Sequence, residues 1–273
     1  MTLLASLVFF TFAPLRSFEE IAITAVEQKG GKVVRLETTR GKPVKGVVLT
    51  NARIDDAWLK ELRDFRSLDS LTLAGTPVSD EGLKELRLHR GLHSLDVSST
   101  HVTNLGMKEL REMKTLRFLD LAGTKVTDEG LTHLKDLPAL EGLHLQFAPI
   151  SDRGLKDLRG LSGLRELNVG YAKITDAGLR ELSGLEKLEV LNVAYTAVTG
   201  PGLKELRGLK NLRRLNLTGT PITDKALNEI VELKSLRELN LDRTSVSDAA
   251  VAELRRIRPD LRVDRGTPPE DSR

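Results

Sequence analysis

Apolar residues recur along this chain with a period of 24 residues. Counted from the first residue of each unit, positions 1, 4, 6, 11, 16, 19 and 22 are apolar in nine consecutive units, which span residues 44–259 without an insertion. Of these 63 positions, 62 obey the pattern, and Leu88 is expected to take the place of the exception, His89. The repeat predicts a solenoid, because one unit cannot bury its own apolar face and a stack can.

The spacing inside a unit predicts its secondary structure. Positions 4 and 6 follow the two-residue period of a strand, and positions 16 and 19 follow the step of a helix. Each unit is therefore expected to hold a short strand, a turn and a short helix, which makes the chain an α/β protein. Ser, Thr or Asp at positions 12 and 13 is expected to cap the helix. The small residue at position 15, such as Gly82, is expected to let the helix pack closely against the strand.

One unit, Leu116 to Leu134, reads LRFLDLAGTKVTDEGLTHL and resembles a leucine-rich repeat. It is similar to the helix-backed bacterial forms, namely the GALA-like, cysteine-containing and planctomycete-type arrays. This resemblance implies a curved horseshoe with parallel strands on the concave face, short helices on the convex face and a protein-binding function. The unit departs at position 9, where Thr or Ala replaces the Asn or Cys of many relatives. Without a convincing F-box segment, the ubiquitin-ligase role of some GALA-type proteins is not carried over.

The segments that flank the repeats have patterns of their own. Residues 17–43 are expected to form an N-terminal cap: a helix that begins with a capping box at Ser17 and Glu20, a strand over Lys32–Glu37 and a turn over residues 38–43. The strand is expected to pair with the first repeat strand and cover its edge. Residues 260–273 are expected to hold a closing strand and a tail.

Residues 1–16 contain an apolar run from Leu3 to Phe12. The run is too short to span a bilayer and resembles the apolar region of a signal peptide. Against export, Met1 and Thr2 bring no basic residue, and Pro14 follows a poor cleavage site. Export or attachment to the cell envelope and a cytoplasmic location with an apolar flap are therefore equally compatible with the sequence.

Composition narrows the function classes. Aromatic residues make up only 4% of the chain, so the core is expected to be aliphatic, and a net charge of +3 gives little basis for binding nucleic acid. With no cysteine, the chain has no thiolate metal site and no cysteine nucleophile. Since the sequence holds no histidine metal motif, phosphate-binding loop or nucleophile motif, we expect no metal, no cofactor and no enzymatic activity. It also lacks the long apolar runs of a multi-span membrane protein.

The repeats differ most on the expected inner face. If positions 4 and 6 face the core, positions 3, 5 and 7 face the concavity, with position 8 at its rim. Position 8 holds an aromatic stripe, and position 5 holds a run of asparagines. The predicted partner-binding residues are Phe118, His144, Gln146, Phe147, Asn168, Tyr171, Asn192 and Tyr195. A protein partner is the leading interpretation and a glycan the alternative, while stacking that only stabilises neighbouring repeats stays open.

Overall fold

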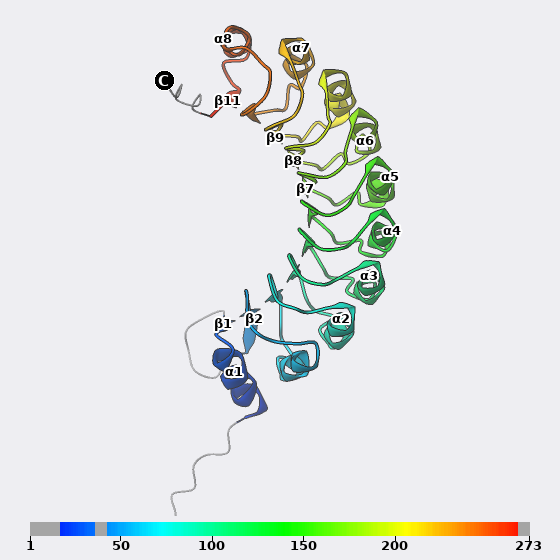
Figure 1. The fold of residues 1–273 in the computed structure, drawn as a ribbon, viewed down its shortest axis with the longest axis vertical. Helices are drawn as coiled ribbons and strands as arrows, with labels where there is room; N and C mark the ends of the chain where they lie inside the picture. Colours follow the sequence, from blue (N-terminus) through cyan, green and yellow to red (C-terminus); the bar gives the residue numbers. More distant parts are fainter. Residues whose placement is uncertain (1–16, 36–42, 267–273) are drawn as a thin grey trace, which may run out of the picture.

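The computed structural model of this chain describes residues 17–35 and 43–266. They form a curved solenoid whose strands line the inner side of the arc and whose helices cover the outer side (Figure 1). The strands make one sheet in sequence order, and they pair in parallel except for the first two. This arrangement confirms the predicted α/β horseshoe.

The strands are short because each repeat contributes only its inner edge to the sheet. From the third strand onward each has three residues, and each residue pairs with its equivalent one repeat later, as Leu143 pairs with Leu167. The strands are β1 (Lys32–Arg35), β2 (Val44–Val48), β3 (Ser70–Thr72), β4 (Ser94–Asp96), β5 (Phe118–Asp120), β6 (Gly142–His144), β7 (Glu166–Asn168), β8 (Val190–Asn192), β9 (Arg214–Asn216), β10 (Glu238–Asn240) and β11 (Arg262–Asp264).

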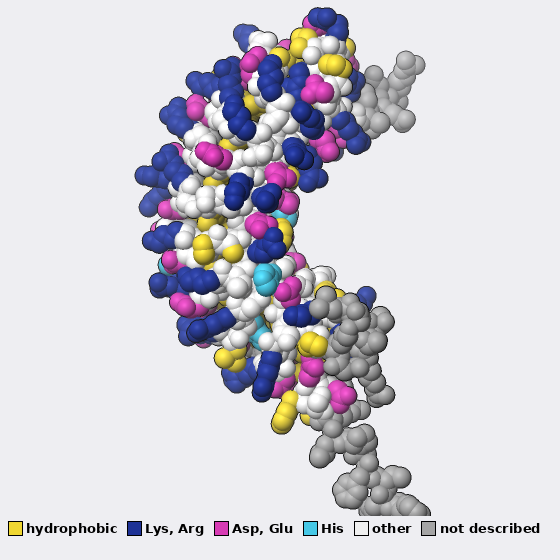
Figure 2. Space-filling model, turned by 180° about the vertical axis from the view of Figure 1, so that it is seen from behind, with side chains coloured by type: hydrophobic (Ala, Val, Ile, Leu, Met, Phe, Trp, Pro, Cys, Tyr) yellow, Lys and Arg dark blue, Asp and Glu magenta, His cyan; other side chains and the backbone are white. Residues whose placement is uncertain are grey.

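The outer side is built from short α-helices and 3₁₀ helices, which often follow one another within a repeat. The α-helices are α1 (Phe18–Gln28), α2 (Asp80–Glu85), α3 (Asn104–Leu110), α4 (Asp128–Leu131), α5 (Asp152–Lys156), α6 (Asp176–Glu181), α7 (Leu227–Val231) and α8 (Asp248–Ile257). The 3₁₀ helices are η1 (Ala57–Asp64), η2 (Leu86–Leu88), η3 (Leu134–Asp136), η4 (Asp157–Gly160), η5 (Gly200–Gly208) and η6 (Asp224–Ala226). Lys and Arg side chains crowd the convex edge, interspersed with Asp and Glu (Figure 2).

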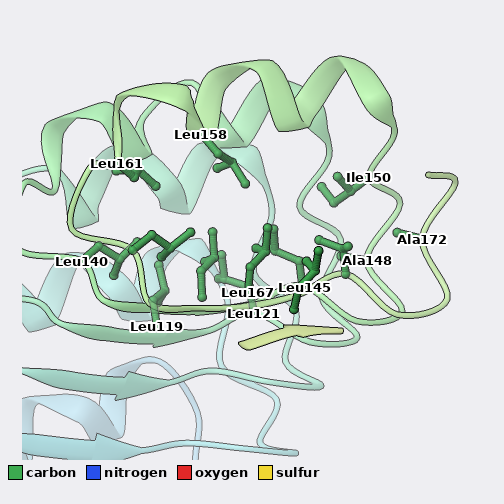
Figure 3. Close-up of a cluster of buried hydrophobic side chains, with 14 of the residues drawn as sticks. Leu119, Leu121, Leu140, Leu145, Ala148, Ile150, Leu158, Leu161, Leu167 and Ala172 are labelled. Carbon is green, nitrogen blue, oxygen red and sulfur yellow. The ribbon is translucent and has the colours of Figure 1, made fainter. Parts of the chain in front are cut away.

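The core is one layer between the strands and the helices. In Figure 3, Leu158 and Leu161 on the helical side point toward Leu145 and Leu167 on the strand side. All 63 repeat positions are buried except Ile257. The seven-column pattern therefore predicted the core almost completely.

Two predictions about position 22 are wrong. His89 itself is buried and Leu88 is 66% exposed, since adjacent residues of the helical turn point in different directions and only position 22 faces the core. In the last repeat Ile257 is 46% exposed, and Arg258 is buried instead. The reason is that α8 continues as one long α-helix through Ile257, which turns this position outward.

The buried Arg258 is fully provided with partners. Its guanidinium donates to both carboxylate oxygens of Asp260, at 2.8 and 2.9 Å, and to the main-chain oxygens of Leu233 and Leu236, at 3.2 and 2.9 Å. These bonds hold the pKa of Asp260 at about 2. Arg258 thus has a structural role at the C-terminal end of the stack.

The aspartates at position 13 link their own repeat to the next one. Asp80 accepts hydrogen bonds from the main-chain N–H and the hydroxyl of Thr103 in the next repeat, at 2.8 and 2.7 Å. We call the series of such links the side-chain ladder. Its links are Asp56–Ser79, Asp80–Thr103, Asn104–Thr127, Asp128–Ser151, Asp152–Thr175, Asp176–Thr199 and Asp224–Ser247. The expected capping is confirmed at position 12, where five side chains accept from N–H groups of the helices that follow them, namely Ser79, Thr103, Ser151, Thr175 and Ser247. The link from position 13 to the next repeat was not predicted.

The glycines at position 15 make room for the residues of the side-chain ladder. A Cβ atom on Gly106 would lie 2.4 Å from Oδ1 of Asp80 and 2.9 Å from Cδ1 of Leu83, both in the preceding repeat. The sequence predicted that the small residue lets the helix pack closely against the strand. The structure shows that the close contact is with side chains of the preceding repeat, so the predicted contact is wrong. The missing side chain makes room for the carboxylate and the leucine of the neighbouring repeat.

The hydroxyls of the threonines at position 9 form hydrogen bonds within their own turn. The hydroxyl of Thr124 is buried and donates to the main-chain oxygen of Leu121, at 2.7 Å. Thr76, Thr100, Thr196, Thr220 and Thr244 make the same bond. A hydroxyl at this position is therefore compatible with the buried turn.

Additional elements cover both ends of the repeat array. Helix α1 begins with the capping box of Ser17 and Glu20, and it buries Ala22 and Val26. Strand β1 pairs antiparallel with β2, and β11 adds to β10 at the far end. Predictions for residues 1–16, 36–42 and 267–273, including most of the turn and the tail, lie outside the described residues. Within residues 17–35 and 43–266, no helix is both long and apolar enough to cross a membrane.

Candidate functional site

Position 8 has a left-handed backbone in every repeat. Its φ angle lies between 53° and 69° in all nine units. The nine residues are Asn51, Gly75, Ser99, Gly123, Phe147, Tyr171, Tyr195, Gly219 and Arg243. Glycine and asparagine suit this conformation, whereas an aromatic residue there is an outlier.

Three consecutive repeats place an aromatic residue at this position. The ring centroids of Phe147 and Tyr171 are 4.3 Å apart with 23° between the ring planes, and those of Tyr171 and Tyr195 are 4.4 Å apart with 17°. We call these three residues the aromatic ladder. Phe147 is 59% exposed and Tyr171 is 49% exposed, while Tyr195 is half-buried. The structure thus brings together three of the predicted residues as a stacked, exposed surface.

The side chains of the position-8 column lean toward the following repeat. The ring of Tyr195 covers Gly219, where a Cβ atom would lie 2.5 Å from Cδ1 of the ring. In the same way, the hydroxyl of Ser99 lies over Gly123, 3.2 Å from the place of a Cβ atom. The aromatic ladder is therefore closed at its Tyr195 end by the backbone of Gly219.

His144 lies on β6 between two carboxylates. Its Nδ1 is 3.2 Å from Oδ2 of Asp120 on β5, and its Nε2 is 3.1 Å from Oε1 of Glu166 on β7. The hydrogen bond to Asp120, aided by the one to Glu166, raises the pKa of His144 to about 9 against the opposing effect of burial. The ring is therefore an imidazolium at neutral pH, with both nitrogens engaged as donors.

The asparagines of position 5 are tied to their own turns. Oδ1 of Asn168 accepts from the N–H of Gly170 at 3.1 Å, and Oδ1 of Asn192 accepts from the N–H of Ala194 at 2.9 Å. Both residues also line an open hollow of about 400 Å³ on the concave face. The charged residues that line this hollow are Glu166, Arg214, Glu238, Arg262 and Asp264. Each amide thus fixes a turn and leaves its NH₂ group as the part available to a ligand.

The remaining predicted residues lie elsewhere. Phe118 covers Gly142, where a Cβ atom would lie 2.6 Å from the Phe118 ring, and it lines a separate hollow with His144. Oε1 of Gln146 is buried and has no hydrogen-bond partner among the described residues. The single patch expected from the sequence is thus divided into the aromatic ladder, the asparagine hollow and the hollow beside Phe118.

Sequence reasoning missed the left-handed backbone and the carboxylates around His144. The first had a signal, because Gly75, Gly123 and Gly219 recur in a column that is otherwise variable. The second also had one, since Asp120 occupies the same column as His144 one repeat earlier. The apolar residues that line the hollow beside Arg214 and Glu238, such as Leu191, belong to the core columns that every repeat shares, so hydrophobic periodicity could not have located the hollow. In the described part of the chain, no group of His, Asp and Glu is arranged to hold a metal ion.

Comparison with protein families finds a match in three segments of the chain. The family model described as Leucine Rich repeat matches residues 112–135, 163–183 and 208–231. No curated protein matches the chain.

Two solved structures from Listeria monocytogenes share the fold. An internalin, inlF, has a TM-score of 0.64 and 19% sequence identity, and the match covers 90% of this chain and 75% of that one. An internalin C2, inlC2, has a TM-score of 0.59 and 21% identity, and the match covers 83% of this chain and 92% of that one. With the matched segments and the unbroken 24-residue repeat, they show that this chain has the leucine-rich repeat fold.

Proposed function

We propose that this protein is a non-catalytic scaffold that binds a protein partner along the concave side of the solenoid, with the aromatic ladder as its anchor. One observation carries the proposal: three stacked aromatic residues, of which Phe147 and Tyr171 are exposed and Tyr195 is half-buried, occupy the same position of consecutive repeats, where the backbone conformation favours glycine or asparagine. The leucine-rich repeat fold is consistent with a protein-interaction scaffold. Tyrosine and other aromatics are also enriched among the residues that dominate binding energy at interfaces.

The energetics favour a role beyond stacking. A left-handed conformation costs a non-glycine residue roughly 1–2 kcal/mol, so three such residues cost about 3–6 kcal/mol. Two stacked aromatic pairs return about 1–3 kcal/mol beyond area burial. The stacking energy beyond area burial does not exceed this conformational cost, which favours a role for the aromatic residues in addition to stacking.

The geometry around His144 supports the absence of catalysis. A general base needs a free nitrogen at neutral pH, whereas both nitrogens of His144 face carboxylates. Its pKa of about 9 also keeps the ring protonated. The one histidine on the predicted binding face is therefore unsuited to activate a nucleophile.

We also propose that the repeats are of the helix-backed bacterial type, in the GALA-like group. The support is the helical outer face of successive repeats and the Thr-Asp-x-Gly turn, as at Thr127 to Gly130. A profile built from these nine repeats should align with GALA-like repeats better than with other classes. A better alignment with another class would contradict this assignment.

A pull-down from native lysate with quantitative mass spectrometry tests the binding function. Tyr171→Asn and Tyr195→Asn should each weaken capture of the partner by at least about tenfold. Asparagine is the suitable replacement because Asn51 already adopts this conformation at the same position. Arg180→Ala, on the exposed outer helix α6, is the matched control.

Two outcomes would contradict the proposal. Wild-type capture by both folded Tyr variants would show that the aromatic ladder is structural. Binding on a glycan array that both variants abolish, together with no captured protein, would favour a sugar ligand.

A further inference from the structure

The aromatic ladder has one closed end and one open end. Tyr195 leans onto Gly219, and the side chains at Asn51 and Ser99 lean in the same direction, toward the next repeat. The face of Phe147 that looks back toward Gly123 therefore has no position-8 side chain against it. Exposure follows this polarity, with 59% for Phe147, 49% for Tyr171 and a half-buried Tyr195.

Gly123 leaves a space the width of one repeat beside this open ring face. The nearest atoms to the place of its Cβ atom all belong to Ser99, at 3.2 Å for the hydroxyl and 3.8 Å for the main chain. No atom of Phe147 is among them, which agrees with a ring that leans away. Neighbouring repeat strands are roughly 4.8 Å apart, so the level of Gly123 lies about one stacking distance from Phe147.

We propose that this space binds a planar aromatic side chain of the protein partner, which stacks on Phe147 as the missing fourth ring of the aromatic ladder. The existing rings already stack at 4.3 and 4.4 Å with nearly parallel planes, so the repeat itself sets the required spacing and orientation. The inference rests on the proposed function for the source of that ring, and it names the anchor that the partner inserts.

The surroundings fit a ring better than a sugar. A sugar needs several polar groups around its rim, whereas the three atoms nearest to the place of a Cβ atom on Gly123 include only one side-chain polar group, the hydroxyl of Ser99. The N–H of Gly123 is already used by the main-chain oxygen of Gln146, at 2.8 Å. A flat apolar group beside Gly123 therefore leaves the main-chain N–H of this residue paired.

The direct test uses p-cresol, which reproduces the tyrosine side chain, and nuclear magnetic resonance of the full chain. Titration should move the ring resonances of Phe147 with a Kd on the order of millimolar. Cyclohexanol and methyl β-glucoside should move them at least about tenfold less at equal concentration. Absence of a saturable shift up to roughly 20 mM p-cresol, or a tighter response to the glucoside, would overturn the inference.

The matched variant supplies the fourth ring from the chain itself. Gly123→Tyr should fold, because the same column accommodates Tyr171 at φ 61°, and it should weaken p-cresol binding at Phe147 by at least about tenfold. Gly123→Asn gives a second, smaller obstruction should the first variant fail to fold. Gly75→Tyr, with φ 69° in the same column, should leave the response of Phe147 within about twofold of wild type. Unchanged binding in the folded Gly123 variants would overturn the inference.

This experiment separates the two proposals. If p-cresol does not bind but capture of the partner still depends on Tyr171, the site beside Gly123 is wrong and the scaffold function stands. If p-cresol binds and Gly123→Tyr blocks it, yet no partner is captured, the aromatic site stands and the scaffold function fails.

Discussion

A single protonated ring links three neighbouring strands on the inner face. His144 bridges Asp120 and Glu166, and the side chain is 34% exposed. Its pKa rises from the ordinary 6.5 to about 9 in the folded protein. A raised pKa means that folding favours the protonated ring. The resulting stability is therefore complete below pH 6.5, declines from there to pH 9 and is lost above it.

The corresponding experiment compares urea unfolding of wild type and His144→Gln at several pH values. After discounting for partial exposure, wild type should lose roughly 1–2 kcal/mol more of its unfolding free energy than the variant between pH 6.5 and 9.5. Parallel pH profiles for the two proteins would show that the bridge contributes nothing to stability.

The core columns predict a large difference in stability between substitutions of two residues from adjacent repeats. Leu167 lies on β7 and is fully buried, whereas Arg159 lies on the outer helix with a side chain 52% exposed. Leu167→Ala should lower the unfolding free energy by about 2–5 kcal/mol, because it leaves a cavity. Arg159→Ala breaks only a surface pair with Glu181 and should change it by less than about 1 kcal/mol. Equal melting temperatures of the two variants in calorimetry would contradict the assigned register.

The sequence predicted the positions of residues whose place depends on burial, but not those of residues whose orientation depends on local backbone geometry. Apolar periodicity located nearly every core residue, since burial acts on each column in the same way. It failed at Ile257, because the local continuation of α8 turned the side chain outward. The sequence placed Tyr171 beside Tyr195, and the recurring glycines of their column signal the left-handed φ, but the direction in which the side chains lean is set by the backbone turn. For this reason the open end at Phe147 could not be predicted.

At the scale of elements, neighbouring helices are joined through the side-chain ladder. Its residue types were recognised from the sequence as helix caps. Their partner in the next repeat was not, because capping and bridging use the same Ser, Thr and Asp side chains. The ladder is interrupted once, where Gly200 faces Thr223 and has no side chain to offer. The following repeat carries Ala226 at the position that is otherwise mostly glycine.

The two exceptions compensate for each other. A Cβ atom on Gly200 would lie 3.1 Å from both the Cα and the Cβ atoms of Ala226, so the glycine makes room for the methyl group. Elsewhere the relation is reversed: Oδ1 of Asp176 occupies the place that a Cβ atom on Gly202 would need. Where other repeats have a carboxylate at position 13 and a glycine at position 15 of the next repeat, this pair has the glycine Gly200 and the methyl group of Ala226.

A double-mutant cycle measures this exchange. Gly200→Asp alone should destabilise the protein by about 1–3 kcal/mol through crowding against Ala226. Adding Ala226→Gly should relieve the crowding and allow the new carboxylate to accept from Thr223. Denaturant unfolding should then give a favourable coupling of about 1–2 kcal/mol between the two substitutions. Additive effects would contradict the proposed compensation.

At the scale of the whole molecule, a stack of repeats needs ends that differ from its middle. Each internal repeat is covered on two sides by its neighbours, so the terminal repeats need other cover for one apolar face. At the N-terminal end, Ala22 and Val26 of α1 join the core, and β1 pairs with β2. Oε1 of Glu19 also accepts from the N–H of Val44, at 2.8 Å. We infer that this segment closes the stack.

Deletion of residues 1–43 is therefore expected to expose the apolar edge formed by Val44, Val47 and Leu49, which are all fully buried in the intact chain. It also leaves the main-chain groups of β2 unpaired on that side, and an uncovered strand edge invites association with other copies. The shortened protein should melt at a lower temperature and form larger species in light scattering. Deletion of residues 1–16 alone keeps α1 and β1, and it provides the control, with melting and size expected to match the full chain. A monomeric 44–273 fragment that melts with the full chain would show that the repeats close without this segment and that the assigned cap is wrong.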